Sequence, residues 1–549
     1  MNKLKSTFIL LIALIIHSCR PVEKEVKATS KPKLVVGIVV DQMRPDYLTR
    51  FAHHFGDKGF SRIMKEGFYA KNTHYNYVPT YTGPGHASIY TGTTPATHGI
   101  IANDWYDRDQ KEFVYCAGDP GRRSIGTDSD EGQMSPHRLL STTITDELML
   151  ATNFRSKVIG ISLKDRGSIL PAGHMPTGSY WFDSKTGDFI TSDYYTQDLP
   201  QWLKDFNSKD LTQQYLSGSW TLSLNKEAYT ASTADNMPYE RKFMEEGEAV
   251  FPYDLAKINE TRKSFSLIKS TPYGNTLLTD LAIETVKANQ MGKDSIPDFL
   301  AMSYSSSDYI GHEFGPRSIE LEDMYIKLNE QIDRLINFLD AEVGKGEYVL
   351  FLTADHAAAE VPQFLTDNKV PAGNYSRKQV RNYLDSLLDK EFGKADWIEN
   401  YSNEQFFFDQ NALDKRKVDK KVVADYAANI LLDFPGVSEV YSFSQMRSHE
   451  YTFGMRNRLQ NGYNFRRSGD LMLVFQPGWF ADYGVATTHG SGYAYDTHVP
   501  LLWYGNGIPA GYSHQTHAIT DIAPTLAFLL NTKLPNGTIG QPMVEILDQ

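Results

Sequence analysis

Acidic residues stand at the carboxyl ends of two short hydrophobic runs in this sequence. Asp41 follows the run 34–40, and Asp355, with His356 beside it, follows the run 348–353. Open α/β sheets bind their ligands just outside the carboxyl ends of their strands, so a site is expected to form there. An aspartate after a strand is also common as a helix cap, so neither position identifies a site by itself.

Two further groups extend this constellation. Asp308 and His312 are four residues apart, which places both side chains on one side of a helical turn. His489 lies in a loop of small residues. Taken singly, these would be a surface pair and a structural histidine. With Asp41 and the pair 355–356 they make three carboxylates and three imidazoles, ligands that suit zinc; six are too many for one catalytic zinc ion, but they suit two metal ions.

A hydroxyl group stands where an anion could bind. Thr82 directly precedes Gly83-Pro84-Gly85, and the run 86–90 can be helical. Proline suits the first helical position, because its missing N–H would have no partner there. Thr82 is therefore predicted at a helix N-terminus, where free N–H groups and the helix dipole favour an anion. It is a candidate nucleophile, although a threonine before Gly-Pro is usually a cap or a turn residue.

Two cations and an amide are candidates to contact such an anion. Lys164 and Arg166 are two residues apart, so on an extended segment their side chains point to one side and Asp165 points to the other. There they could clamp a dianion, the arginine in bidentate fashion. The other interpretation is a solvated strand end with a surface ion pair. Asn103 is a candidate neutral donor, or else a turn residue.

The elements that must position these residues follow an α/β pattern. Continuous aliphatic runs are typical of strands buried on both faces, as in parallel sheets covered by helices. Such runs occupy residues 34–40, 157–163, 299–304, 348–353, 471–475 and 499–504. Residues 318–339 show apolar side chains at helical spacing. We therefore predict an α/β fold with a mostly parallel central sheet flanked by helices.

Two long segments interrupt this alternation. Residues from 176 to about 270 are rich in tyrosine, tryptophan, serine, threonine and asparagine, and residues from 363 to about 465 are charged and mixed. We predict that both are insertions in one catalytic domain spanning 34–549, and that they lie over the strand ends where the site forms.

The composition is that of a folded globular protein. Of 549 residues, 41% are hydrophobic and 22% are charged, which argues against disorder. The net charge of -12 argues against nucleic-acid binding, because the phosphate backbone requires basic patches, but it does not exclude a small anionic substrate. Of the two cysteines, Cys116 is predicted to be a buried small hydrophobe.

The N-terminus has the pattern of a targeting signal. Two lysines precede the apolar run 8–16, which is too short to span a bilayer and fits a signal-peptide core. A small residue before Cys19 resembles a bacterial lipoprotein processing site. We predict a signal peptide over 1–19, a lipid on Cys19 and a polar tether over 20–33; a plain secretory signal is the alternative. We expect an exported monomer in the periplasm or at the outer membrane or cell surface of a Gram-negative bacterium.

Several separate motifs, in a consistent order, resemble those of one family. They are VVDQMR (39–44), HASIYTG (86–92), HGIIANDWY (98–106), SLKDR (162–166), TADH (353–356) and ITDIAPTL (519–526). On these motifs the chain resembles the alkaline phosphatase superfamily from about residue 33 to the C-terminus. Within it, the chain is most similar to the secreted bacterial phosphate-irrepressible alkaline phosphatases of the PafA type.

The resemblance implies two zinc ions at the ends of the strands. The ligands of the first would be Asp41, Asp355, His356 and Thr82. The ligands of the second would be Asp308, His312 and His489. His498 is the rival for the last position, and His489 is preferred because its Thr-Thr-His setting matches the family.

The resemblance also implies a covalent mechanism. Thr82 would attack phosphorus and form a phosphothreonine, with Thr80 as its rival. The non-bridging phosphoryl oxygens would be contacted by Asn103, Lys164 and Arg166. The sequence departs from the family at Pro84, which we expect to have little effect on the chemistry.

The implied activity is hydrolysis of phosphate monoesters, with broad specificity and release of inorganic phosphate. Lys164 and Arg166 favour monoesters, because a diester has one free oxygen fewer and would leave a buried donor unpaired. The alternative is a phosphodiesterase or nucleotide pyrophosphatase of the same superfamily. A sulfatase would need a C/S-x-P-x-R signature, which residues 82–86 lack. A binding protein that had lost activity would be expected to lack a ligand or the nucleophile, and none is missing.

Overall fold

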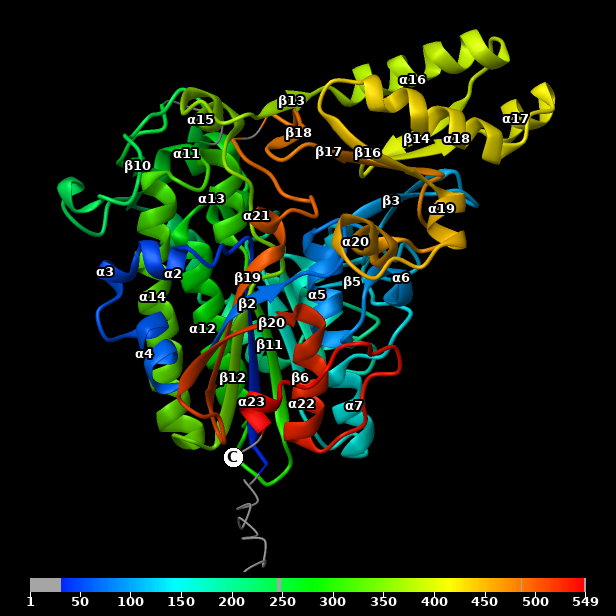
Figure 1. Cartoon of the computed structure of the whole chain (residues 1–549). Coiled ribbons are helices and arrows are strands. Elements are labelled where there is room, and N and C mark those ends of the chain that lie inside the picture. The colour runs from blue at the N-terminus through cyan, green and yellow to red at the C-terminus, as the bar shows by residue number, and fades with distance from the viewer. Residues whose placement is uncertain (1–30, 244–247, 485, 548–549) are drawn as a thin grey trace, which may run out of the picture.

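Five of the six aliphatic runs form strands of a ten-stranded sheet (Figure 1). This computed structural model describes residues 31–243, 248–484 and 486–547. In the order of the sheet, the strands are β20 (Gly511–Ala518), β2 (Phe68–His74), β19 (His498–Gly505), β12 (Tyr348–Thr353), β1 (Leu34–Val40), β11 (Asp298–Tyr304), β6 (Val158–Ser162), β7 (Gly178–Phe182), β8 (Phe189–Ser192) and β5 (Ser124–Ile125).

The pairings confirm the predicted mostly parallel sheet. The five neighbours from β12 to β7 are all parallel, and so are β2 and β20. The run expected at 499–504 forms β19, which is antiparallel to both of its neighbours. At the other edge, β8 is antiparallel to β7 and to β5.

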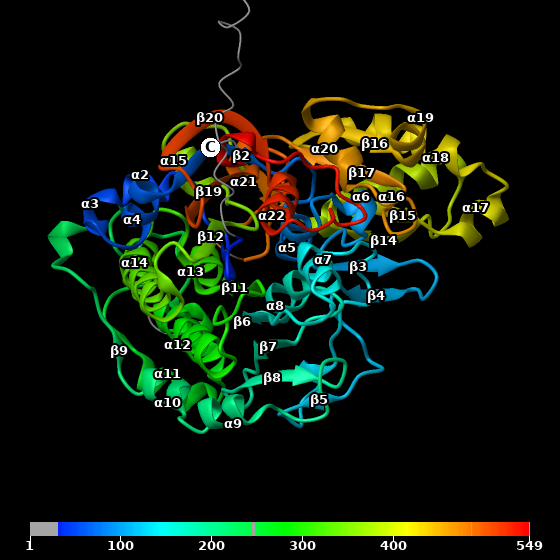
Figure 2. The ribbon, with the colours of Figure 1, turned by 90° about the horizontal axis from the view of Figure 1, so that it is seen from below.

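Helices cover both faces of this sheet, as the doubly buried runs require (Figure 2). On one face lie α12 (Pro272–Ala288), α13 (Ser306–Phe314) and α14 (Ile319–Leu339). On the other lie α5 (Thr82–Thr91), α7 (Ile144–Ala151), α8 (Asp165–Ala172) and α22 (Ile522–Leu530). The predicted helix over 318–339 is α14, and it begins after Ser318, whose side chain accepts a hydrogen bond from the Leu321 N–H.

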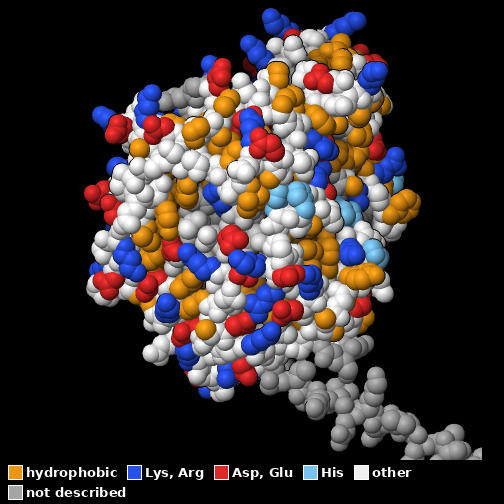
Figure 3. Space-filling view, turned by 90° about the vertical axis from the view of Figure 1, so that its left-hand side faces the viewer, with side chains coloured by type: hydrophobic (Ala, Val, Ile, Leu, Met, Phe, Trp, Pro, Cys, Tyr) orange, Lys and Arg blue, Asp and Glu red, His pale blue; other side chains and the backbone are white. Residues whose placement is uncertain are grey.

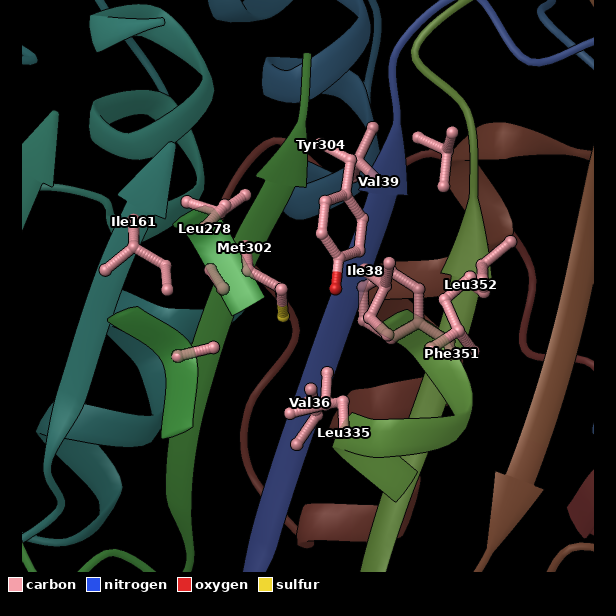
Figure 4. Packing of buried hydrophobic residues seen from close by; sticks show 14 of the residues in the cluster. Val36, Ile38, Val39, Ile161, Leu278, Met302, Tyr304, Leu335, Phe351 and Leu352 are labelled. Atoms are coloured by element: carbon pink, nitrogen blue, oxygen red, sulfur yellow. The ribbon is translucent and has the colours of Figure 1, made fainter. Parts of the chain in front are cut away.

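The core between the sheet and α14 is closely packed (Figure 4). Val36 of β1, Met302 of β11 and Leu352 of β12 are buried on the face of the sheet that also carries Leu335 of α14 and Leu278 of α12. Burying each such side chain stabilises the fold by roughly 1.5–3 kcal/mol. This layer fixes β1, β11 and β12, the strands that carry most of the predicted ligands.

One predicted strand belongs to a different sheet. The run 471–475 forms β17 (Leu471–Phe475), and the expectation that it joins the central sheet is wrong. It lies in a four-stranded sheet with β14 (Ile398–Ser402), β15 (Gln405–Phe408) and β16 (Val437–Ser442), next to α16 (Arg377–Phe392) and α18 (Lys420–Ile430). The two faces of β17 pack into two separate small clusters, so the strand is buried on both sides without being central.

The segment from 176 to about 270 begins inside the central sheet, to which it adds β7 and β8. The rest leaves the sheet and includes α9 (Gln201–Asn207), α10 (Leu211–Leu216) and α11 (Leu255–Arg262) (Figure 2). Figure 3 shows acidic and basic side chains interspersed over one side of the molecule. Among the described residues, no helix combines the length and apolarity needed to cross a bilayer. The predicted signal peptide and Cys19 lie outside the described residues.

Candidate active site

Neighbouring parallel strands bring the predicted ligands to one edge of the sheet. β1 lies between β11 and β12, with Val40 opposite Tyr304 and Val39 opposite Thr353. Asp41 follows β1, and Asp355 lies two residues beyond the end of β12. The helix after β11 is α13, which carries Asp308 in its first turn. Because parallel strands end at the same edge, these side chains converge.

The first set of candidate ligands is completely buried. His356 Nε2 lies 3.5 Å from Asp41 Oδ1 and 3.5 Å from Asp355 Oδ2. None of these three atoms has a hydrogen-bond partner among the described residues. The other ring nitrogen of His356 donates to the Ala357 carbonyl at 3.0 Å, so Nε2 carries the lone pair in the neutral ring. Three unpartnered, buried acceptors facing one another fit a metal ion.

The second set has the same design. The Nε2 atoms of His312 and His489 lie 3.1 and 3.7 Å from Asp308 Oδ1. Their Nδ1 atoms donate to the backbone carbonyls of Thr487 and Thr80, at 2.7 and 2.8 Å. Both Nε2 atoms therefore face the centre, with the orientation that second-shell hydrogen bonds give to metal-binding histidines.

Asp308 joins the two sets. One of its carboxylate oxygens lies within 4.8 Å of ring nitrogens of His312 and His489, and one lies within 4.8 Å of potential ligand atoms of Asp41 and His356. Asp355 approaches only the first set, through His356. The structure thus brings together all six residues that the sequence pattern selected as ligands.

The electrostatics show why this cluster needs positive charge. Burial, with the neighbouring carboxylates of Asp308 and Asp355, raises the pKa of Asp41 to about 7. Burial likewise raises the pKa of Asp355 to about 6 and lowers that of His356 to about 4. Burial also acts to raise the pKa of Asp308, but Lys164 and His312 outweigh it and hold that pKa well below its usual range. Cations at the centre would relieve the repulsion between these carboxylates.

Lys164 lies against both sets of ligands. Its Nζ is 2.6 Å from Asp41 Oδ2 and 2.6 Å from Asp308 Oδ2, and the residue is buried. The expectation that Lys164 and Arg166 share one side of an extended segment is wrong, because the chain turns into α8 directly after Lys164. Lys164 is the residue before the helix, and Arg166 lies in its first turn.

Arg166 and Asn103 each keep donors available. Arg166 Nη1 donates to the Tyr115 hydroxyl at 3.1 Å, and Tyr115 in turn donates to Asp165. The Arg166 Nε–H is buried without an acceptor among the described residues. Asn103 Oδ1 accepts the Gly83 N–H at 2.7 Å, which fixes its amide so that the Nδ2 donors remain for another group.

Thr82 stands at a helix N-terminus, as predicted. The helix α5 begins at Thr82 itself, so Pro84 is its third residue rather than its first. Thr82 is buried, and its carbonyl accepts a hydrogen bond from His86 Nδ1 at 2.8 Å. The rival hydroxyl of Thr80 donates to the Ser491 carbonyl at 2.9 Å.

Two other candidates lie outside the cluster. His498 donates from Nε2 to the Lys71 carbonyl at 2.9 Å and stacks on His74, with ring centres 4.5 Å apart. Cys116 is a free, buried thiol in an apolar cluster, as predicted, and burial raises its pKa to about 12.

Gln42 is a site residue that the sequence pattern missed. Its side-chain amide donates to Asp308 Oδ1 at 2.7 Å, and its backbone N–H donates to Asp355 Oδ1 at 3.1 Å. Its φ of 63° is in the left-handed region, which is unfavourable for a residue with a side chain. The only feature of the sequence that could have indicated Gln42 is its position directly after Asp41.

Gly85 allows α5 to approach the first set of ligands closely. A Cβ at this position would lie 2.3 Å from the Asp355 carbonyl oxygen and 2.8 Å from its Cβ. We expect Gly85→Ala to displace Asp355, to destabilise the protein by about 1–3 kcal/mol and to weaken metal binding. Chemical denaturation measures the loss of stability, and zinc analysis measures the weaker metal binding. Gly218→Ala is the control, since a Cβ there meets no atom within 4 Å; equal behaviour of the two variants would contradict this prediction.

The site and the fold can now be compared with known proteins. A family model described as type I phosphodiesterase / nucleotide pyrophosphatase matches residues 35–498. Alkaline phosphatase PafA of Elizabethkingia meningoseptica is 44% identical over 527 residues, covering 95% of this chain and 96% of that protein. Alkaline phosphatase PhoV of Synechococcus elongatus is 42% identical, covering 99% and 100%.

A solved structure agrees with this relationship. The crystal structure of wild-type alkaline phosphatase PafA has a TM-score of 0.91 and 44% sequence identity, covering 94% of this chain and 99% of that chain. The chain therefore belongs to the type I phosphodiesterase / nucleotide pyrophosphatase family, a member of the alkaline phosphatase superfamily.

Proposed function

We propose that this protein is a zinc-dependent alkaline phosphatase that hydrolyses a broad range of phosphate monoesters through a phosphothreonine on Thr82. The observation that carries the proposal is the position of Lys164, whose ammonium contacts one carboxylate of each candidate ligand set. A cation at the metal centre suits a dianionic substrate. Two close relatives are named alkaline phosphatases, which supports the same activity.

The candidate ligands divide into two metal sites. Asp41, Asp355 and His356, with Thr82, would hold one zinc ion, and Asp308, His312 and His489 would hold the other. When bound, two zinc ions supply Lewis acidity, lowering the pKa of a coordinated hydroxyl and stabilising the departing oxygen.

The chain's own residues then have distinct tasks. The Thr82 oxygen attacks phosphorus in line with the leaving oxygen, the P–O bond to the alcohol breaks, and water later cleaves the phosphothreonine to free phosphate. Lys164 has a third ammonium proton beyond its two carboxylate contacts, and it suits a non-bridging phosphoryl oxygen. The Arg166 Nε–H and the Asn103 amide are the other donors, aimed by Tyr115 and by the Gly83 N–H.

The test compares a monoester with a diester. With zinc-loaded protein, we expect 4-nitrophenyl phosphate to be preferred over bis(4-nitrophenyl) phosphate by roughly 10³-fold or more in kcat/KM, because the diester leaves a buried donor unpaired. Lys164→Ala should narrow that preference by about 10–100-fold.

The matched control is Lys157→Ala. Lys157 lies at the opposite end of β6 and donates to the Gln290 carbonyl. This variant should prefer the monoester over the diester as strongly as the unmodified protein does. A preference for the diester would favour the phosphodiesterase alternative. Hydrolysis of neither ester, with zinc bound, would point to a binding protein.

We further propose that the protein acts as an exported monomer, anchored through a lipid on Cys19.

A further inference from the structure

The candidate active site opens into a pocket that is walled partly by the segment 363–465. We call it the mouth pocket. Its inner wall includes Asn103, His312 and His489, and its outer wall includes Arg377, Asn403 and Tyr483. Tyr81 and Tyr309 also line it, and each contacts the inner site. The Tyr81 ring packs edge-on against His489 with centres 5.6 Å apart, and Lys164 Nζ lies 4.9 Å from the centre of the Tyr309 ring.

Arg377 is the notable residue of the outer wall. It is the first residue of α16, where the helix dipole disfavours a cation, so its position is not explained by helix stability. Its guanidinium lies 5.5 Å from the ring centre of Tyr483 and 6.0 Å from that of Tyr401. Cation–π contacts of this kind hold the guanidinium beside the rings and do not use its N–H donors as hydrogen bonds to an acceptor would.

No acceptor for those donors is found in the described part of the chain. Arg377 takes part in no hydrogen bond or ion pair with any residue of 31–243, 248–484 or 486–547. The nearby carboxylate of Glu404 instead accepts hydrogen bonds from the hydroxyls of Tyr375 and Tyr81, at 2.7 and 3.4 Å. A half-buried guanidinium without an acceptor, in the wall of a pocket, is suited to a carboxylate or phosphate of a ligand.

We propose that the mouth pocket is a leaving-group subsite, in which Arg377 pairs with a second anionic group on the leaving group of the substrate. The inference rests on the proposed function. A phosphoryl group held at the inner wall and attacked in line by Thr82 directs its leaving group away from the metal ligands, toward the opening. The rings of Tyr81 and Tyr483 would contact the body of that group. Arg241 and the acidic side chains of Asp104 and Glu313 also line the pocket, so the charge of its wall is mixed, and Arg377 is distinguished by having no acceptor among the described residues.

The experiment uses two aryl monoesters of similar shape. One is 4-carboxyphenyl phosphate, and the other is its neutral analogue, 4-carbamoylphenyl phosphate. The measured quantity is the kcat/KM for 4-carboxyphenyl phosphate divided by the kcat/KM for 4-carbamoylphenyl phosphate, with zinc-loaded protein. Arg377→Ala should lower this ratio by about tenfold, and Arg377→Glu should lower it further, because the anion then meets a like charge. A third ester with a phosphonate at the same position shows whether a dianion is preferred over a carboxylate.

Lys378→Ala is the matched control. It removes the same charge from the neighbouring position of α16, but Lys378 does not line the mouth pocket. The proposal is supported if the ratio changes with Arg377 and not with Lys378. It is overturned if the ratio is unchanged in both Arg377 variants, or if Lys378→Ala lowers it equally, which would indicate long-range charge alone. Failure of the unmodified protein to hydrolyse either ester would instead contradict the proposed function itself.

Discussion

Replacing Thr82 by alanine is expected to lower kcat for 4-nitrophenyl phosphate by roughly 10³-fold or more, because the variant has no nucleophile to form the covalent intermediate. Thr82 is buried at the start of α5, and the N–H of the next residue, Gly83, donates to the Asn103 amide oxygen. The Thr80 hydroxyl already donates to the Ser491 carbonyl, so no other hydroxyl is expected to replace that of Thr82. The direct measurement is acid quenching during turnover of a ³²P-labelled monoester. The unmodified protein should retain label on a peptide that contains Thr82, and the variant should retain none.

Two further variants make this prediction specific. Thr82→Ser keeps a hydroxyl and should still acquire the label, on serine. Thr80→Ala removes the rival hydroxyl, which donates to the Ser491 carbonyl, and it should still label at position 82 because the Thr80 carbonyl that accepts from His489 is retained. Label lost from Thr80→Ala and kept by Thr82→Ala would reverse the assignment.

The parts of the fold that could be predicted are those that depend on local pattern. A run such as 348–353 is buried on both faces wherever it lies, and the structure places it as β12 with the same bounds. Because β1, β11 and β12 are parallel neighbours, the residues after them had to converge at one edge. Five of the six candidate ligands could therefore be predicted from the strands that precede them, whereas His489 lies in a loop before β19 and was predicted from its residue type and its small-residue setting.

What could not be predicted depends on contacts between distant segments. The run 471–475 has the pattern of a central strand, but burial on two faces does not specify which sheet provides the burial, and β17 pairs with β15 and β16 instead. The two-residue spacing of Lys164 and Arg166 places their side chains on the same side only if the extended segment continues through both residues. Instead, α8 begins at the residue between them, Asp165. Arg377 carried no signal, because its pocket forms only when α16 is brought beside the strand ends.

Gln42 shows a third kind of omission. A glutamine after a strand has no chemistry of its own that singles it out, and its role appears only through its two partners, Asp308 and Asp355. These contacts orient one carboxylate from each ligand set through a single residue. The left-handed backbone at Gln42 is consistent with this arrangement, since strain of this kind is retained where the surroundings require it.

Asp308→Asn is expected to remove more metal than the loss of any other single ligand. The Asp308 carboxylate lies within 4.8 Å of potential ligand atoms in both sets, whereas Asp355 is paired with His356 of the first set. Its Oδ1 accepts from Gln42 and its Oδ2 accepts from Lys164. In Asp308→Asn, the new NH₂ group would face one of these two donors, and that contact could no longer be a hydrogen bond. We expect zinc content to fall from about two ions per chain to below about one, and to about one in Asp355→Asn.

Zinc analysis after gel filtration, beside turnover of 4-nitrophenyl phosphate, measures both quantities. Asp165→Asn is the control, because that carboxylate is close to the site through Tyr115 but belongs to neither set of ligands, and it should keep about two zinc ions per chain. If Asp308→Asn and Asp355→Asn each keep one ion, the prediction is wrong, and Asp308 acts only as a ligand of the second ion without affecting how Asp41 and His356 hold the first. If Asp308→Asn keeps both, the carboxylate is not a ligand, and its low pKa reflects the pairing with Lys164 and His312 alone.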